Sequence, residues 1–169
     1  MKPARLRPLV LGTLLSAMPL ATSQACIGDG AIDGVLISVP AGTYALADAM
    51  YQAISKGQIT PVANTSLNTV QFMMQRQLQQ HYQGEILDIT LFDSSGMHFL
   101  RLRGDGQSLT LNAHEVPKDQ FQDILVTDVD ALAAMARKQA SFSDIVRLQL
   151  MHDATSQTEF TQLMQRTYG

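Results

Sequence analysis

The residues with the most suggestive spacing for chemistry are His114 and Glu115, which open the segment His-Glu-Val-Pro-Lys. A zincin motif has the form His-Glu-x-x-His, because two imidazoles one helical turn apart can reach the same metal ion. Lys118 stands where the second histidine is required, and Pro117 disfavours the interior of a helix. The segment is therefore not interpreted as a zincin site.

The remaining candidate ligands and nucleophiles are isolated along the chain. The four histidines are far apart in sequence: His81, His98, His114 and His152. We interpret them as surface or edge residues rather than as one metal site. No Gly-x-Ser-x-Gly nucleophile elbow is present, and Cys26 stands in a stretch too flexible to hold a thiol against a base. We therefore expect no catalytic residue, no cofactor and no metal ligand.

Two further features have both a functional and a structural interpretation. Arg103-Gly104-Asp105 spells an adhesion tripeptide, but Gly and Asp between two predicted strands are typical of a tight turn. His98 falls on the apolar side of a predicted strand, next to Phe99. A half-buried histidine there would titrate near pH 6 and could couple folding or binding to acid. The alternative for His98 is a neutral histidine in the sheet or at its rim.

The first 25 residues have the three-part plan of a secretory signal peptide. Residues 1–8 carry three basic residues and no acid, residues 9–20 are apolar, and Ser23 and Ala25 precede the expected cleavage site. The apolar run is about 12 residues long, whereas a membrane-spanning helix needs about 20. We predict export to the periplasm and no transmembrane span after cleavage.

Cleavage removes three of the 12 basic residues and none of the 15 acidic ones, so the mature chain has a formal charge of −6. This acidic balance argues against nucleic acid as a partner. Cys26, the only cysteine, would become the first mature residue. It is either a free or intermolecular thiol or the lipidated residue of an anchored lipoprotein, although Ser23-Gln24-Ala25 fits a lipoprotein signal poorly.

Hydrophobic periodicity predicts two helices before the strands begin. The first covers residues 43–56, with Thr43 as its cap and Gly57 as its stop. The second begins at Ser66 and has this inward stripe: Leu67, Val70, Met74, Leu78 and Tyr82. Six glutamines between residues 71 and 83 are assigned to its solvated face.

From residue 87 the period changes from 3.6 to 2. Apolar residues alternate over residues 87–91, 98–102 and 109–111, with turns at 93–96 and 104–106. We predict an α+β fold in which the second helix packs on a three-stranded antiparallel meander. Exposed edges of this sheet and its outward side offer surfaces for strand addition or docking.

Residues 117–169 are predicted to form an α/β extension. We expect a short strand at 124–126, a helix capped by Thr127, a strand at 146–150 and a last helix with a Ser156–Glu159 capping box. A β-hairpin through residues 145–165 is the alternative. The predicted organisation is a signal peptide (1–25), a flexible N-terminal segment with a possible short strand (26–42), the α+β domain (43–116) and the extension (117–169).

Residues 53–113 resemble a PepSY domain, a small α+β module of secreted and membrane-attached bacterial proteins. The similar segments are ISKGQITPV at residues 54–62, HYQGEILDI at 81–89, GMHFLRL at 96–102, Gly104-Asp105-Gly106 and Leu111-Asn112-Ala113. Asn112 departs from the family pattern, which has Asp there, and the segment after Ala113 differs as well.

The resemblance implies a non-catalytic module that acts through protein contacts. PepSY domains occur in propeptides of secreted peptidases, where an inhibitory or chaperone role is proposed, and beside envelope-sensing systems. We therefore expect a regulatory protein whose partner is a secreted peptidase or an envelope sensor. The alternative is a periplasmic sensor of pH, or a sensor or carrier of a small ligand, with a pocket between sheet and helix.

Overall fold

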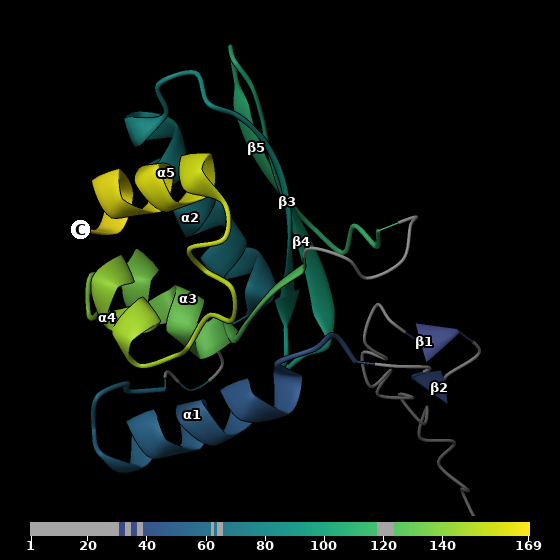
Figure 1. Ribbon diagram of the computed structural model, residues 1–169, viewed down its shortest axis with the longest axis vertical. Coiled ribbons are helices and arrows are strands. Elements are labelled where there is room, and N and C mark those ends of the chain that lie inside the picture. The colour runs from purple at the N-terminus through teal and green to yellow at the C-terminus, as the bar shows by residue number, and fades with distance from the viewer. Residues whose placement is uncertain (1–30, 33–34, 37–38, 62, 64–65, 118–123) are drawn as a thin grey trace, which may run out of the picture.

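The computed structural model describes residues 31–32, 35–36, 39–61, 63, 66–117 and 124–169 (Figure 1). Its elements follow in the order β1 (Ala31–Ile32), β2 (Val35–Leu36), α1 (Thr43–Ser55), α2 (Leu67–His81), β3 (Ile86–Asp93), β4 (His98–Asp105), β5 (Leu109–Ala113), β6 (Ile124–Thr127), α3 (Val129–Ala136), α4 (Phe142–Arg147) and α5 (Thr158–Tyr168). The predicted signal peptide, Cys26 and most of the predicted flexible segment 26–42 lie outside the described residues. Among the described residues, no helix is long and apolar enough to cross a membrane.

The main sheet has four strands in the described part of the chain, one more than the predicted meander. The strand order is β5-β4-β3-β6, and β4 pairs antiparallel with both β3 and β5. β6 runs parallel to β3, with Leu125 opposite Leu91. The α+β class is confirmed, but the expected count of three strands is wrong because β6, predicted as part of the extension, joins the same sheet.

Helices cover one face of the antiparallel strands. In Figure 1, helices α2 to α5 all lie on the same side of β3, β4 and β5. The strand residues that face this helical layer are buried apolar side chains: Leu87, Ile89, Leu91, Leu100, Leu102, Leu109 and Leu111. Alternate residues of the strands point to the opposite face, because side chains in a strand alternate sides.

The first two helices begin and end largely as local rules predict. The Ser66 hydroxyl accepts a hydrogen bond from Thr69 N at 3.2 Å and caps α2. Gly57 follows α1 with a φ of 67°, a conformation that glycine adopts without steric cost. The predicted cap Thr43 is wrong by one residue, since Gly42 is the N-cap of α1 and the Thr43 hydroxyl donates to Pro40 O at 2.7 Å.

The glutamines of α2 bind the edge of the sheet instead of facing only solvent. Gln71 Nε2 donates to Leu111 O at 2.6 Å, Gln75 Nε2 donates to Leu109 O at 2.8 Å, and Gln79 Nε2 donates to the same oxygen at 3.1 Å. Leu111 N in turn donates to Gln75 Oε1. For these three glutamines the predicted solvated face is wrong, because an edge strand leaves backbone groups that need partners.

The other edge of the sheet is also occupied. His152 N donates to Val126 O at 2.8 Å, and Thr127 forms an isolated antiparallel bridge with Met151. Strand addition at the edges is therefore not favoured at either of these positions. The outward face of the sheet is the surface that remains.

The predicted strand at residues 146–150 is wrong, because that segment begins inside α4. Ser141 and Asp144 form a capping box in which each side chain accepts from the backbone N–H of the other. Phe142 and Ile145, three residues apart, turn the buried side of this short helix inward. Ser141 thus begins a helix.

The last helix is confirmed and the caps of α3 and α5 are corrected. α5 has Gln157 as its N-cap, without a side-chain cap, so the Ser156–Glu159 capping box is wrong. Asp128, not Thr127, caps α3 by accepting from Asp130 N at 2.9 Å. The Thr127 hydroxyl instead donates to Leu150 O at 3.1 Å in the core.

The predicted extension shares its core with the rest of the fold. Phe160 and Leu163 of α5 and Leu132 of α3 belong to the same cluster of buried residues as α1, α2 and the sheet. Glu85, which precedes β3, forms an ion pair with Arg166 of α5. Residues 124–169 therefore stabilise the unit that residues 43–116 begin.

Candidate functional site

The outward face of the antiparallel strands lies opposite helices α2 to α5 (Figure 1). Phe92 and Phe99 on this face are each 1% exposed, and the remaining part of it is mostly polar. We call this surface the open sheet face; it comprises Ile86, Asp88, Arg101, Arg103, Thr110 and Asn112. Ile86 is 79% exposed and is the large apolar residue of the set. The face therefore combines an apolar side chain with fixed charges.

The charges of the open sheet face are held by ion pairs between strands. Arg101 donates from Nε to Asp88 Oδ1 at 2.6 Å and from Nη2 to Asp88 Oδ2 at 2.7 Å. Arg103 Nε lies 3.6 Å from Asp88 Oδ1, and its Nη1 donates to Glu115 Oε2 at 3.1 Å. The hydrogen bond from Arg101, helped by the positive charges of both arginines, lowers the pKa of Asp88 against the opposing effect of burial.

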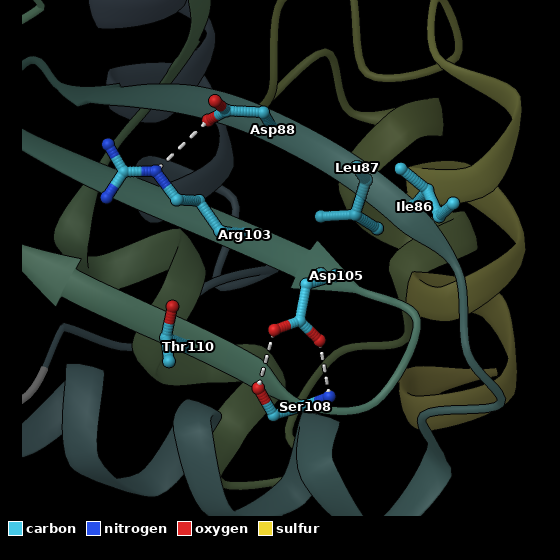
Figure 2. A pocket seen from close by; sticks show the side chains of 8 residues that line it. Ile86, Leu87, Asp88, Arg103, Asp105, Ser108 and Thr110 are labelled. Atoms are coloured by element: carbon cyan, nitrogen blue, oxygen red, sulfur yellow. Dashed lines mark hydrogen bonds and ion pairs between the residues drawn. The ribbon is translucent and has the colours of Figure 1, made fainter.

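A shallow hollow of about 590 Å³ lies at one end of this face (Figure 2). It is lined by Ile86, Leu87, Asp88, Arg103, Gly104, Asp105, Ser108 and Thr110. Asp105 is turned into its own loop, where its carboxylate accepts from Gln107 N at 2.9 Å and Ser108 N at 2.7 Å. These backbone bonds, the one from Ser108 first, lower the pKa of Asp105. Since Arg103 is ion-paired and Asp105 closes a turn, the structural interpretation of the Arg-Gly-Asp sequence is favoured.

Next to the hollow, an aromatic residue between α2 and β3 connects the segment before β3 to the β4–β5 turn. The Tyr82 hydroxyl donates to Glu85 O at 2.6 Å and accepts from Gly106 N at 2.8 Å. A Cβ atom on Gly104 would lie 2.5 Å from Glu85 O and 3.0 Å from the Tyr82 ring, so only glycine fits there. These contacts of Tyr82 and Gly104 hold Glu85, the residue before Ile86, at the start of β3.

A second hollow, of about 430 Å³, lies between the β3–β4 turn and the start of α2. We call it the turn hollow; it is lined by Ser66, Leu67, Asn68, Asp93, Ser95, Gly96, His98, His114 and Val129. The half-buried ring of His98 meets the ring of His114 edge to face, with centroids 4.8 Å apart. The fold therefore brings together two of the four histidines, although they are 16 positions apart in sequence.

Two buried carboxylates stand beside the turn hollow, and the sequence analysis did not single them out. Asp93 is 1% exposed and Asp128 is 8% exposed. Burial first, and then the negative charges of Asp93 and Asp130, raise the pKa of Asp128 to about 6 against the lowering effect of hydrogen bonds from Asp130 N and Ser94. The signal in the sequence is an Asp that precedes Ser-Ser-Gly, a turn pattern, and an Asp at a helix start.

The remaining candidate residues do not come together. His152 Nε2 lies 3.4 Å from Asp153 Oδ2, and His81 ends α2. Within the part of the chain that the structure describes, no group of three or more His, Cys, Asp or Glu residues could hold a metal ion. Cys26 lies outside the described residues, so its lipidation stays a prediction.

Comparison with known proteins gives no match: no family model, curated protein or solved structure is similar enough to count as a relative.

Proposed function

We propose that this chain is an exported, non-catalytic binding module of the PepSY type that acts through protein contacts at the open sheet face. Its partner is a secreted peptidase that it restrains or an envelope sensor to which it reports. The observation that carries this proposal is the exposed Ile86 beside a set of paired charges on the sheet face opposite helices α2 to α5. The resemblance of residues 53–113 to PepSY sequences supports the class of partner.

The chemistry of the open sheet face suits recognition of a protein. Full burial of an isoleucine side chain contributes about 1.5–3 kcal/mol, so Ile86 can act as an apolar anchor. The bidentate pair of Arg101 and Asp88 is already formed, so a partner need not order these side chains on binding. Charges fixed in this way contribute more to partner choice and association rate than to raw affinity.

The proposal is tested by affinity capture from bacterial envelope extract with matched variants. Ile86→Lys places a charge on the open sheet face, and Phe72→Lys makes the same type of change on α2, where Phe72 is 68% exposed. We expect the wild type and Phe72→Lys to enrich the same protein and Ile86→Lys to lose it. Enrichment that is unchanged by Ile86→Lys would count against this face.

The two forms of the proposal differ in what the captured protein does. For a secreted peptidase, adding the wild-type chain should slow cleavage of a fluorescent protein substrate, and Ile86→Lys should slow it less. For an envelope sensor, deletion of the chain should change the sensor's phosphorylation state. If the captured protein shows neither of these effects, a regulatory role is contradicted.

A second candidate function is pH or small-ligand sensing at the turn hollow. The observation that favours it is the pair of rings, His98 and His114, beside the buried Asp93. Substitution of His98 by Gln, followed by thermal unfolding from pH 5 to 8, tests the pH form. An unchanged pH profile would reject a role for His98, and thermal-shift screening with metals and small ligands tests the ligand form.

A further inference from the structure

Asp93 connects three parts of the fold through one buried carboxylate. Its Oδ1 accepts from Ser95 N at 3.2 Å and from Ser95 Oγ at 2.7 Å, and its Oδ2 accepts from Gly96 N at 3.1 Å. The same Oδ1 also accepts from Val129 N, the first residue of α3, at 2.9 Å. Asp93 therefore holds the β3–β4 turn against the N-terminus of α3.

Asp128 is the second carboxylate at this junction. Its Oδ1 caps α3 by accepting from Asp130 N at 2.9 Å, and its Oδ2 lies 3.5 Å from Ser94 Oγ in the turn. Ser94 N also donates to Thr127 O at 2.8 Å, so backbone and side chains join the turn to the β6–α3 corner. Two nearly buried carboxylates thus accept hydrogen bonds from the N-terminus of α3 and from the β3–β4 turn.

The charges around the junction are mainly negative. Asp93 comes from β3 and Asp130 from α3, and both raise the energy of an ionised Asp128. Ser94 is the polar group that faces Asp128 from the turn, and His98 of β4 and His114 after β5 line the turn hollow on the Asp93 side. In the described parts of the chain, neither Asp93 nor Asp128 has an ion pair with Lys or Arg.

We propose that Asp93 and Asp128 form an acid-tightened latch between the β3–β4 turn and α3. An ionised Asp128 weakens the junction, because its charge is buried and is repelled by the carboxylates of Asp93 and Asp130. Uptake of one proton removes that repulsion and leaves the backbone hydrogen bonds of both side chains in place. The contact between the β3–β4 turn and α3 therefore becomes more stable as the pH falls.

The direction follows from proton linkage. The pKa of Asp128 is about 6 in the folded chain, whereas the ordinary value for an Asp side chain is 3.8, so between these two pH values the folded state binds more protons than the unfolded state. Stability is then gained as the pH falls through 6 and is complete below about 3.8, and it is lost as the pH rises. Between pH 7.5 and pH 5 the latch should lower the unfolding equilibrium constant about tenfold.

Urea unfolding of the full mature chain at pH 5.0 and pH 7.5 tests the latch. Asp128→Asn keeps a good N-cap and imitates the neutral acid. It should therefore lose about a tenfold change in the unfolding equilibrium constant between pH 7.5 and pH 5, and it should be more stable than the wild type at pH 7.5. Asp130→Asn is the matched control on the same helix and should keep most of the wild-type dependence. Equal pH dependence in wild type and Asp128→Asn would overturn the latch.

Two measurements keep the test independent of how well the variant folds. In the wild type, the carboxyl carbon of Asp128 should titrate with a midpoint near 6, and a midpoint near the ordinary value would overturn the proposal. The Val129 and Gly96 amides should become about tenfold better protected from hydrogen exchange, after correction for the intrinsic rate, between pH 7.5 and pH 5. Unchanged protection would also overturn the latch, because Asp128 would then titrate without strengthening the contact between the β3–β4 turn and α3.

The latch does not rest on the proposed partner. Its titration and exchange are measured on the isolated chain, so loss of partner capture with Ile86→Lys and loss of the Asp128 titration are separate results. His98 and His114 are present in both the wild type and Asp128→Asn, so the difference between these two proteins reports mainly on Asp128.

Discussion

Replacement of Gln75 should remove the central support of the β5 edge. This side chain donates to Leu109 O at 2.8 Å and accepts from Leu111 N. Gln75→Ala removes both bonds, and Gln75→Met removes the same bonds while keeping a side chain of similar length. Leu109 O retains its bond from Gln79, so the Leu111 N–H is the group that loses its partner.

The expected cost follows from that one backbone group. An unsatisfied buried donor costs about 1–3 kcal/mol. For a domain of this size each kcal/mol lowers Tm by about 2–4 °C, so Gln75→Ala should lower Tm by about 2–12 °C. Gln75→Met should show most of the same loss, because it restores packing and not hydrogen bonding.

The assay is thermal and urea unfolding of the two variants, with Gln80→Ala as the control. Gln80 is exposed on the same helix, and a change there should stay within about 0.5 kcal/mol. If Gln75→Met is as stable as the wild type, the hydrogen bonds to β5 do not stabilise the edge and the reasoning is refuted. Size-exclusion chromatography of Gln75→Ala adds a second readout, since a freed edge promotes self-association.

The remaining predictions concern three other contacts. Tyr82→Phe should cost about 1–2 kcal/mol in urea unfolding, because Gly106 N and Glu85 O lose their shared partner; unchanged stability would contradict this role. Glu85→Gln should cost about 1–3 kcal/mol and increase hydrogen exchange in α5, since it weakens the pair with Arg166; a protected α5 would argue against that anchor. Ser141→Ala should cost about 1 kcal/mol through loss of the α4 cap, whereas Ser143→Ala should be nearly neutral; equal effects would reject the capping box.

Local sequence rules predict the elements whose signals are local. Ser66 and Gly57 mark the ends of helices because a side-chain oxygen satisfies a free N–H and because glycine accepts a positive φ. The alternation over β3, β4 and β5 places Leu87, Leu102 and Leu111 on one face, as the structure has them. These features depend on neighbours within a few residues, so they can be read directly from the chain.

Long-range features were missed for a physical reason. The pairing of β6 with β3 joins residues more than 30 positions apart, and nothing in the local pattern identifies a parallel neighbour. Val146, Leu148 and Leu150 alternate like a strand, yet the Ser141 cap makes the first of them helical. The glutamines of α2 were assigned to a solvated face, because their partners are backbone atoms of β5 and the sequence does not show which backbone groups need a partner.

The candidate site also combines residues that local sequence patterns identify and residues whose role depends on long-range contacts. His98 was singled out, but its neighbour His114 was assessed only in a failed zincin motif and as one of four histidines far apart in sequence. Asp93 and Asp128 are ordinary turn and cap residues in the sequence, and their importance comes from burial beside one another. The open sheet face was predicted as a docking surface, and its particular anchor, Ile86, could be chosen only once its exposure was known.

Photo-crosslinking in living cells tests the account most directly. A benzophenone amino acid is placed at Ile86 in one strain and at Phe72 in another, because both side chains are large, apolar and exposed. We expect a discrete adduct with one envelope protein from position 86 and no such adduct from position 72. The same adduct from position 72 alone, or no adduct from position 86, would contradict binding through the open sheet face.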